Sequence, residues 1–287
     1  MLNAEWIEFF SETGCQIGLS IDGPEWLHDL HRKDRASRGT FGRAIAGARL
    51  LHDNSIPFTN IATLTSDSLD HADEIFDFFF ALGPAKLAFN IEEAEGANAV
   101  SSLYRKEFVE KVESFFARIA ELNFKSSKPF RIREIESVLT SLAIRPSQWR
   151  TSQETEFGRI VAIGVNGDVA LFSPELLTTI RVDGSRAVVG NLLNSDFQEI
   201  IESSSATLLK HAIDDGVAIC RSNCDFFDFC GGGSPANKYY EHHRFDVAET
   251  WFCRLSKKAA TKGILRAINL FGDQEIPERS THACLKS

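Results

Sequence analysis

The sequence has no long run of apolar residues. A bilayer-spanning helix needs roughly 18 to 20 of them in succession, and no stretch of the 287 residues approaches that length. The first residues, MLNAEWIEFFSETG, also lack the basic and apolar blocks of a secretory signal, because Glu5, Glu8 and Glu12 interrupt them. We therefore expect no membrane partner and a cytoplasmic location, where thiols are kept reduced.

An excess of positive charge and internal repeats are absent as well. The formal net charge is −9, which argues against a nucleic-acid backbone or an anionic membrane surface as the main partner. Apolar residues make up 43% of the chain and charged residues 25%. This balance is typical of a globular protein with a sizeable core.

Cysteine is almost absent before residue 220. The one exception, Cys15, has no neighbouring thiol, and we predict that it is a core residue. Four of the six cysteines then fall within 34 residues, at Cys220, Cys224, Cys230 and Cys253. In a reducing compartment, a group of this kind predicts metal ligands rather than disulfides.

The spacing of these four cysteines is irregular. Three residues separate Cys220 from Cys224, five separate Cys224 from Cys230, and Cys253 follows a glycine-rich turn. Structural zinc sites usually show two short cysteine pairs, whereas a 4Fe-4S cluster tolerates irregular spacing. We favour the cluster, with backbone N–H groups of residues 231–233 near the sulfurs. Zinc and a set of reduced core cysteines are the alternatives.

The first hundred residues predict alternating helices and strands, and so a parallel sheet of βαβ units. We expect an uncapped helix over 1–13, a helix over 41–53 with Thr40 as its cap, and a helix that Gly83 closes. We also expect a strand buried on both faces in QIGLSI. The remaining predicted strands are IPFTNIATL and AKLAFNI. Three parallel strands alone would leave exposed edges, so the isolated chain should aggregate.

The rest of the chain predicts helices and a hairpin. SSLYRKEFVEKVESFFARIAELNF and RIREIESVLTSLA are helical patterns, and RIVAIGVNGDVALF predicts two strands around a two-residue turn at Asn166–Gly167. AVVGNLL predicts a short strand, and NSDFQEIIESSS a helix capped by Asn194 or Ser195. We therefore divide the chain into 1–98, a helical linker over 99–155, a cysteine-containing domain over 156–270 and a tail over 271–287.

Two blocks of the sequence resemble a known family. The pattern C-x3-C-x5-C-G-G-G…C after a hairpin resembles the SPASM extension of radical S-adenosylmethionine (SAM) peptide maturases, which are related to anaerobic sulfatase-maturating enzymes. IGLSIDGPEWLHDLHRKDRASRGTFGRAIAGARLL resembles the fourth strand and following turn of their barrel. FSPELL and CGGGSPANKYYE are most similar to the GRRM-type branch, which forms cyclophane rings. The resemblance implies an α/β fold: a partial parallel β/α barrel with a small SPASM-type hairpin and cysteine-rich domain.

The sequence departs from that family in three places. One auxiliary 4Fe-4S pattern is complete at the four cysteines, but Phe172, Ser173 and Ser234 replace ligands of a second cluster. The C-x3-C-x2-C loop that binds the SAM-cleaving cluster is absent, and so is the GGEP segment. The aspartate used as a catalytic base by sulfatase-maturating relatives has no counterpart, so the catalytic residues are unknown. Three strands instead of six imply a truncation before Met1, at roughly 30 residues per strand–helix unit.

The resemblance also implies a SAM-binding pair, Ser20 and Arg32, because a serine and a guanidinium suit the carboxylate of SAM. The alternative is a strand-end serine and a solvent arginine. We interpret Asp22 and Gly23 as a structural turn. His28 and His31 are predicted to be helix-surface residues and Glu92 and Glu95 solvated loop acids, although these two acids could face the pocket. His242 and His243 are predicted to lie in an exposed loop.

These observations predict the C-terminal portion of a radical SAM oxidoreductase that modifies side chains of a ribosomally made precursor peptide, by an oxidative crosslink or a related reaction. SAM would bind only if the missing N-terminal half were supplied, so the chain alone should be inactive. The alternative is a non-catalytic or decayed homologue that binds a peptide or a partner maturase.

Overall fold

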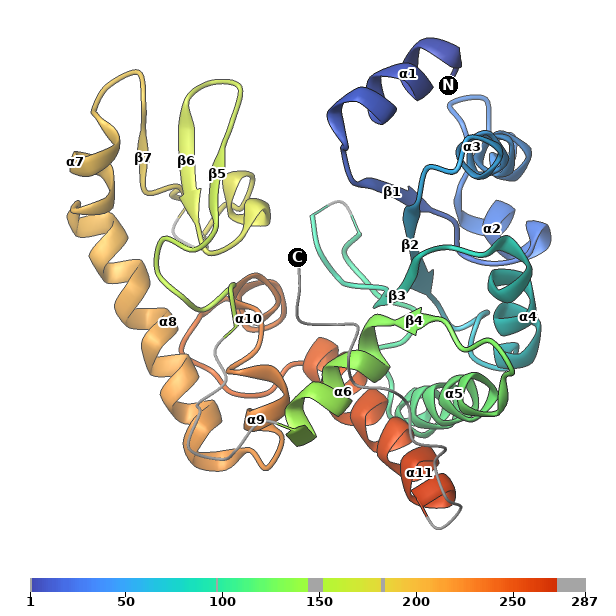
Figure 1. The fold of residues 1–287 in the computed structure, drawn as a ribbon. Coiled ribbons are helices and arrows are strands. Elements are labelled where there is room, and N and C mark those ends of the chain that lie inside the picture. Colours follow the sequence, from blue (N-terminus) through green and yellow to red (C-terminus); the bar gives the residue numbers. More distant parts are fainter. Residues whose placement is uncertain (1, 97, 144–151, 182–183, 273–287) are drawn as a thin grey trace.

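The computed structural model describes residues 2–96, 98–143, 152–181 and 184–272. Figure 1 shows two lobes. The sheet lobe contains residues 2–143 and the last helical segment, 253–272, and the cysteine lobe contains residues 152–252. Parts of the predicted linker and tail, at 144–151 and 273–287 with Cys284, lie outside the described residues. Within the described part, no helix combines the length and apolar character that a bilayer span requires.

The sheet lobe contains a four-stranded parallel sheet in the order β1-β2-β3-β4. The predicted α/β fold with a parallel sheet is thus confirmed. The fourth strand falls in the segment predicted as a helical linker, and it has only two residues, too few for an apolar pattern in the sequence. The strands are β1 Ile17–Ser20, β2 Phe58–Leu64, β3 Lys86–Ile91 and β4 Arg131–Ile132.

Beyond the end of β4, the side chains of Arg133 and Glu134 form hydrogen bonds with β3 in place of a paired strand. The backbone N–H of Phe89 donates to Glu134 Oε1 at 3.2 Å. The Arg133 guanidinium donates to the Phe89 carbonyl and, at 2.9 Å, to Asn90 Oδ1. Backbone groups of β3 that another strand would satisfy are therefore satisfied by a carboxylate and a guanidinium.

Besides the C-terminal helix α11 Ala260–Gly272, six helices accompany this sheet among the described residues. They are α1 Ala4–Thr13, α2 Glu25–His31, α3 Phe41–Asp53, α4 Ala72–Leu82, α5 Lys106–Lys125 and α6 Arg133–Ala143. Gly83 ends α4 with a left-handed conformation (φ 65°), as predicted.

Three local predictions for this lobe are wrong. Helix α1 is capped, because Asn3 Oδ1 accepts from the Trp6 N–H at 3.1 Å. Asp29 rather than Thr40 caps α3: its Oδ1 accepts from the N–H groups of Thr40 and Phe41 at 2.8 and 2.9 Å. Strand β1 is not buried on both faces, since it lies at the edge of the sheet with alternate residues exposed.

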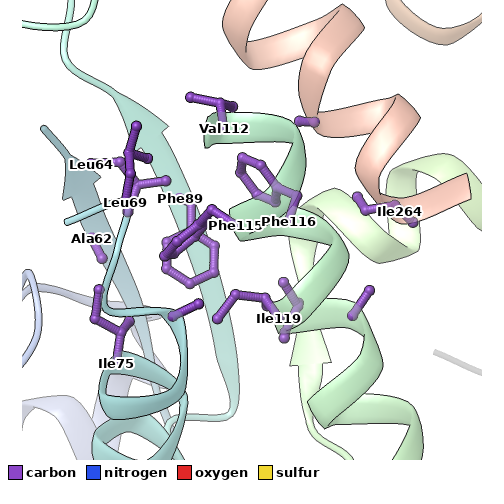
Figure 2. Packing of buried hydrophobic residues seen from close by; sticks show 14 of the residues in the cluster. Ala62, Leu64, Leu69, Ile75, Phe89, Val112, Phe115, Phe116, Ile119 and Ile264 are labelled. Carbon is purple, nitrogen blue, oxygen red and sulfur yellow. The ribbon is translucent and has the colours of Figure 1, made fainter. Parts of the chain in front are cut away.

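The largest core cluster joins the sheet to α4, α5 and the C-terminal helix (Figure 2). Phe89 of β3 lies at its centre, with its ring 5.5 Å from that of Phe115 and 5.9 Å from that of Phe116. The π-helix Cys253–Ala259 and the helix α11 Ala260–Gly272 that follows it were not predicted from the sequence. Gly263 lets α11 approach α5 closely, because a Cβ there would lie 2.2 Å from the Glu113 carbonyl oxygen.

The cysteine lobe begins with a three-stranded antiparallel sheet, β5 Val161–Ile163, β6 Asp168–Leu171 and β7 Gly190–Asn191. The hairpin is confirmed but its turn is longer than predicted, since Ile163 and Val169 are the last paired residues. The lobe also contains the 3₁₀ helix Pro174–Leu177, α7 Phe197–Ile201, α8 Ser204–Asn223, α9 Phe227–Cys230 and α10 Pro235–His242.

Two features of these helices differ from the predictions. The cap of α7 is Asp196, not Asn194 or Ser195, and it forms a capping box with Glu199. The 20-residue helix α8 was not predicted at all. It runs along the lobe (Figure 1), and its last turn contains Cys220.

Candidate functional site

Three helical segments bring the four clustered cysteines together. Cys220 lies in the last turn of α8, and Cys224 is the residue that ends it. Cys230 ends α9, and Cys253 begins the π-helix that leads into the sheet lobe. The thiols of Cys220 and Cys253 each interact electrostatically with those of Cys224 and Cys230. The predicted ligand set therefore converges in space.

Burial makes these thiols hard to ionise by themselves. It raises the pKa of Cys253 to about 12 and also raises the pKa of Cys220. The thiolate is the form that binds metal, and a bound cation reverses this preference because it stabilises the negative charge. The donor set is thus four soft sulfur ligands, and two of them, Cys220 and Cys253, lie where burial disfavours the thiolate unless a positive group is present.

The glycine-rich turn packs against Cys220. Gly231, Gly232 and Gly233 all have positive φ values, of 69°, 115° and 79°. The thiol of Cys220 donates to the carbonyls of Gly232 at 3.5 Å and Ala248 at 3.4 Å. The contact from this turn to the sulfur is therefore a carbonyl group and not the N–H that we expected.

A second candidate site lies at the carboxyl ends of the parallel strands, where α/β sheets bind ligands. It is a cavity of about 240 Å³ lined by Asp22, Leu27, His31, Arg32, Thr63, Thr65, Ser68 and Glu92. Arg32 donates to both oxygens of Asp22, at 2.5 and 2.9 Å. Asp22 Oδ1 also accepts from the Thr63 N–H at 2.8 Å. Asp22, interpreted from the sequence as part of a turn, thus holds Arg32 at the cavity.

The other residues predicted near this cavity differ in how well their observed exposure agrees with the prediction. Ser20 is exposed at the last position of β1. His28 is not a surface residue: it is 1% exposed, and its Nε2 lies 3.0 Å from Thr40 Oγ1. Glu92 is not a solvated acid, since it lines the cavity and accepts from the Ser102 N–H at 2.6 Å.

Two further predictions concern exposure. Cys15 is exposed, with the Thr13 hydroxyl 3.1 Å from its sulfur, so the prediction of a core thiol is wrong. The reason is its position before the edge strand β1. His242 and His243 are exposed at the end of α10, as predicted.

Carboxylates from both lobes meet where the loop after β3 contacts the cysteine lobe. Glu93 and Glu95 follow β3, and they interact electrostatically with Glu154 and Glu175 of the cysteine lobe. Asn237 of α10 donates to Glu93 Oε2 at 2.5 Å. Burial, and then the neighbouring carboxylates, raise the pKa of Glu95 to about 7. Glu95 is therefore not a solvated loop acid, and the tertiary fold rather than any sequence pattern assembles this group.

No family model matches the chain. An uncharacterized protein of Synechocystis (sll1766) is 34% identical over 268 residues, which cover 93% of this chain and 67% of that protein. The serine-type anaerobic sulfatase-maturating enzyme of Klebsiella aerogenes is 36% identical over 97 residues, 34% of this chain and 24% of the enzyme. The cysteine-type enzyme of Clostridium perfringens is 30% identical over 79 residues, 21% of its length.

Two solved structures share the fold. Native anSMEcpe with bound AdoMet superimposes with a TM-score of 0.68 at 19% identity, over 96% of this chain and 74% of that one. Streptococcus suis SuiB bound to S-adenosylmethionine gives a TM-score of 0.57 at 14% identity, over 88% of this chain and 57% of SuiB. Both lobes are therefore included in the likeness, which at these identities concerns the fold.

Proposed function

The chain belongs to the radical SAM maturase family, and from this premise we propose that it is the C-terminal portion of an enzyme that modifies side chains of a ribosomally made peptide. The observation that carries the proposal is the convergence of Cys220, Cys224, Cys230 and Cys253 at the junction of the two lobes. The parallel sheet is then part of a β/α barrel, and the cysteine lobe is its SPASM-type extension.

The irregular spacing of the four cysteines in the sequence favours a 4Fe-4S cluster over zinc. A single zinc ion needs its four ligands within about 2.3 Å of one point, whereas a cubane binds each thiolate at a separate iron corner. Among the described residues, no three His, Cys, Asp or Glu side chains are grouped as ligands of a metal ion, so the choice of cluster over zinc rests on the sequence spacing. When bound, the cluster supplies one-electron transfer, and the four cysteines hold it at the lobe junction.

The positions of the missing second-cluster ligands support a single auxiliary cluster. Phe172 is fully buried in the core of the cysteine lobe, and Ser173 donates to the Glu175 carboxylate. Ser234 precedes α10 and forms a side-chain hydrogen bond with Glu154. These three positions are filled by packing and hydrogen bonds among protein groups.

Arg32 and Ser20 are the residues that we propose for the SAM carboxylate. Asp22 fixes Nε and one terminal nitrogen of the Arg32 guanidinium, and Nη1 has no hydrogen-bond partner among the described residues. A ligand carboxylate could therefore bind Nη1 without breaking the Asp22 pair. Ser20 ends β1 at the same edge of the sheet and could donate its hydroxyl.

We place the peptide between the two candidate sites. The structural relatives include anSMEcpe with a bound Cp18Cys peptide and SuiB bound to the precursor peptide SuiA. In this chain, Glu93 and Glu95 follow β3 at the end of the sheet where Arg32 lies, and Asn237 joins that loop to the cysteine lobe. A GRRM-type oxidative crosslink is the specific reaction that the FSPELL and CGGGSPANKYYE segments favour.

A second candidate function is a non-catalytic homologue that binds a peptide or a partner maturase. The observation that favours it is the lack of a C-x3-C-x2-C loop in the sequence. The chain spans 67% of the length of the Synechocystis relative.

A SAM-cleavage assay separates the two functions. The reconstituted, dithionite-reduced chain alone should form no 5′-deoxyadenosine above a no-protein control. Addition of a separate N-terminal barrel half should restore cleavage. Arg32→Ala should then weaken SAM binding about tenfold or more, since a charge-assisted hydrogen bond contributes about 1.5–3 kcal/mol, whereas exposed Arg35→Ala should not.

Three outcomes contradict parts of this proposal. Turnover by the 287-residue chain alone would show that its cluster binds SAM directly. Unchanged binding in the Arg32→Ala protein would remove Arg32 from the SAM site. Failure of every complementing half to restore cleavage, with SAM binding also absent, would favour the non-catalytic homologue.

A further inference from the structure

Lys238 is a buried lysine inside the cysteine lobe. It lies on α10 and is 3% exposed, and its Nζ is 3.7 Å from Cys220 Sγ. Its ammonium also interacts electrostatically with the thiols of Cys230 and Cys253. Among the described residues, no carboxylate oxygen lies within ion-pair distance of Nζ. The ammonium also interacts electrostatically with Asp246, but Cys220 Sγ, at 3.7 Å, lies closer to Nζ than any carboxylate oxygen among the described residues.

The fold makes room for this side chain. A Cβ at Gly216 of α8 would lie 2.9 Å from Lys238 Nζ and 2.2 Å from the Phe245 carbonyl oxygen, so any larger residue there would displace the lysine or the backbone. Gly233, in the turn after Cys230, passes the lysine stem in ordinary contact, with its Cβ position 3.7 Å from Cε. Two glycines thus border the path by which the ammonium reaches Cys220.

A buried ammonium is costly unless an anion pairs with it. Lys258, the other lysine near these cysteines, has such an anion, because Glu249 lies 2.6 Å from its Nζ. Lys238 has thiols instead. A protonated thiol gives the ammonium only a weak acceptor, but a thiolate gives it a full negative charge. The ammonium therefore gains a close anionic partner when the cysteines are thiolates, as they are when they ligate iron.

We propose that Lys238 is a positioning residue for the cluster: it donates a hydrogen bond to the ligating sulfur of Cys220 and raises the reduction potential of the cluster. Hydrogen bonds to the sulfurs and nearby charge are two of the factors that set such potentials. A cation beside the ligands stabilises the reduced cluster, which carries one more negative charge than the oxidised one. The inference rests on the proposed 4Fe-4S site.

Redox titration of the reconstituted full chain tests the inference. The midpoint potential should become more negative in Lys238→Met, which removes charge and donor, and should shift less in Lys238→Gln, which keeps an amide donor. Lys258→Met is the matched control and should leave the potential nearly unchanged, because Glu249 already neutralises that lysine. Iron and sulfide content and far-UV circular dichroism are measured on every variant.

The outcomes distinguish this inference from the cluster assignment. A wild-type chain that takes up no iron and sulfide would overturn both. A wild-type cluster with equal potentials in wild type, Lys238→Met and Lys238→Gln would overturn the role of Lys238 alone. If Lys238→Met does not fold, the midpoint potentials of Lys238→Gln and Lys258→Met are compared with that of the wild type. Equal shifts of the potential in these two variants contradict the inference. A shift in Lys238→Gln alone supports it.

Discussion

The two lobes of the molecule are stabilised in different ways. The sheet lobe has a continuous apolar core between the parallel sheet, α4, α5 and α11. The cysteine lobe has a smaller apolar core around its hairpin and α8, and beyond it an interior that contains thiols and the ammonium of Lys238. The described core cluster of the first lobe consists of apolar side chains, whereas one end of the second lobe contains buried polar groups that a ligand would pair.

The largest effect should come from the centre of the sheet lobe. Phe89→Ala should lower the free energy of unfolding by about 3–5 kcal/mol, because it leaves a cavity among well-packed rings. Phe89 is 3% exposed, whereas Phe80 on α4 is 44% exposed, so Phe80→Ala should cost about 1 kcal/mol or less. Urea unfolding measures both. Equal losses would mean that this core is not packed as described.

The contact between α11 and α5 should give the next largest effect. Gly263→Ala would place a Cβ 2.2 Å from the Glu113 carbonyl oxygen, so α11 must shift, at a cost of about 1–3 kcal/mol. Gly42→Ala is the matched control in α3, where nothing lies within 4 Å of the new Cβ, and it should be stabilising. A stabilising Gly263→Ala would show that α11 does not dock on the sheet lobe.

The hydrogen bond between the lobes should contribute less. Asn237→Ala removes the amide that donates to Glu93 Oε2 at 2.5 Å, which should cost about 1 kcal/mol of unfolding free energy. Asn269→Ala, an exposed change on α11, serves as the control and should be close to neutral. If both variants melt alike, this bond does not connect the lobes in solution.

The smallest effect is a dependence on pH. The folded-state pKa of Glu95 is raised from 4.5 to about 7, so the native chain binds this proton more tightly than the unfolded chain. The contribution of Glu95 to the free energy of unfolding should therefore be fully present below pH 4.5 and be lost as the pH rises from about 4.5 to 7. Glu95→Gln should flatten this part of the profile. If the free energy of unfolding of the wild type rises over this interval relative to that of Glu95→Gln, the raised pKa is contradicted.

The sequence predicted those features that depend on local pattern. The strands β2 and β3, helix α4 with Gly83 and the grouping of the four cysteines all have signals within a few neighbouring residues. Strand β4 has two residues and so no pattern of its own. The close approach of α11 to α5 depends on Gly263 meeting Glu113, which no local signal reveals.

The candidate sites also combine features with local sequence signals and features that depend on tertiary contacts. Ligand types and their spacing indicated a metal site, but the buried Lys238 and the pairing of Arg32 with Asp22 depend on tertiary contacts. Likewise, Glu154 and Glu175 lie far from Glu93 in the sequence, so their convergence could not be predicted from it.

The metal content of the anaerobically reconstituted chain tests whether the four clustered cysteines hold a 4Fe-4S cluster. We expect about four irons and four sulfides per chain, as for a cubane with four thiolate ligands. Cys224→Ser should lose them, whereas Cys15→Ser should keep them because Cys15 is exposed at the start of the sheet lobe. One zinc per chain without sulfide, or an iron content that does not depend on Cys224, would contradict a 4Fe-4S cluster at these cysteines.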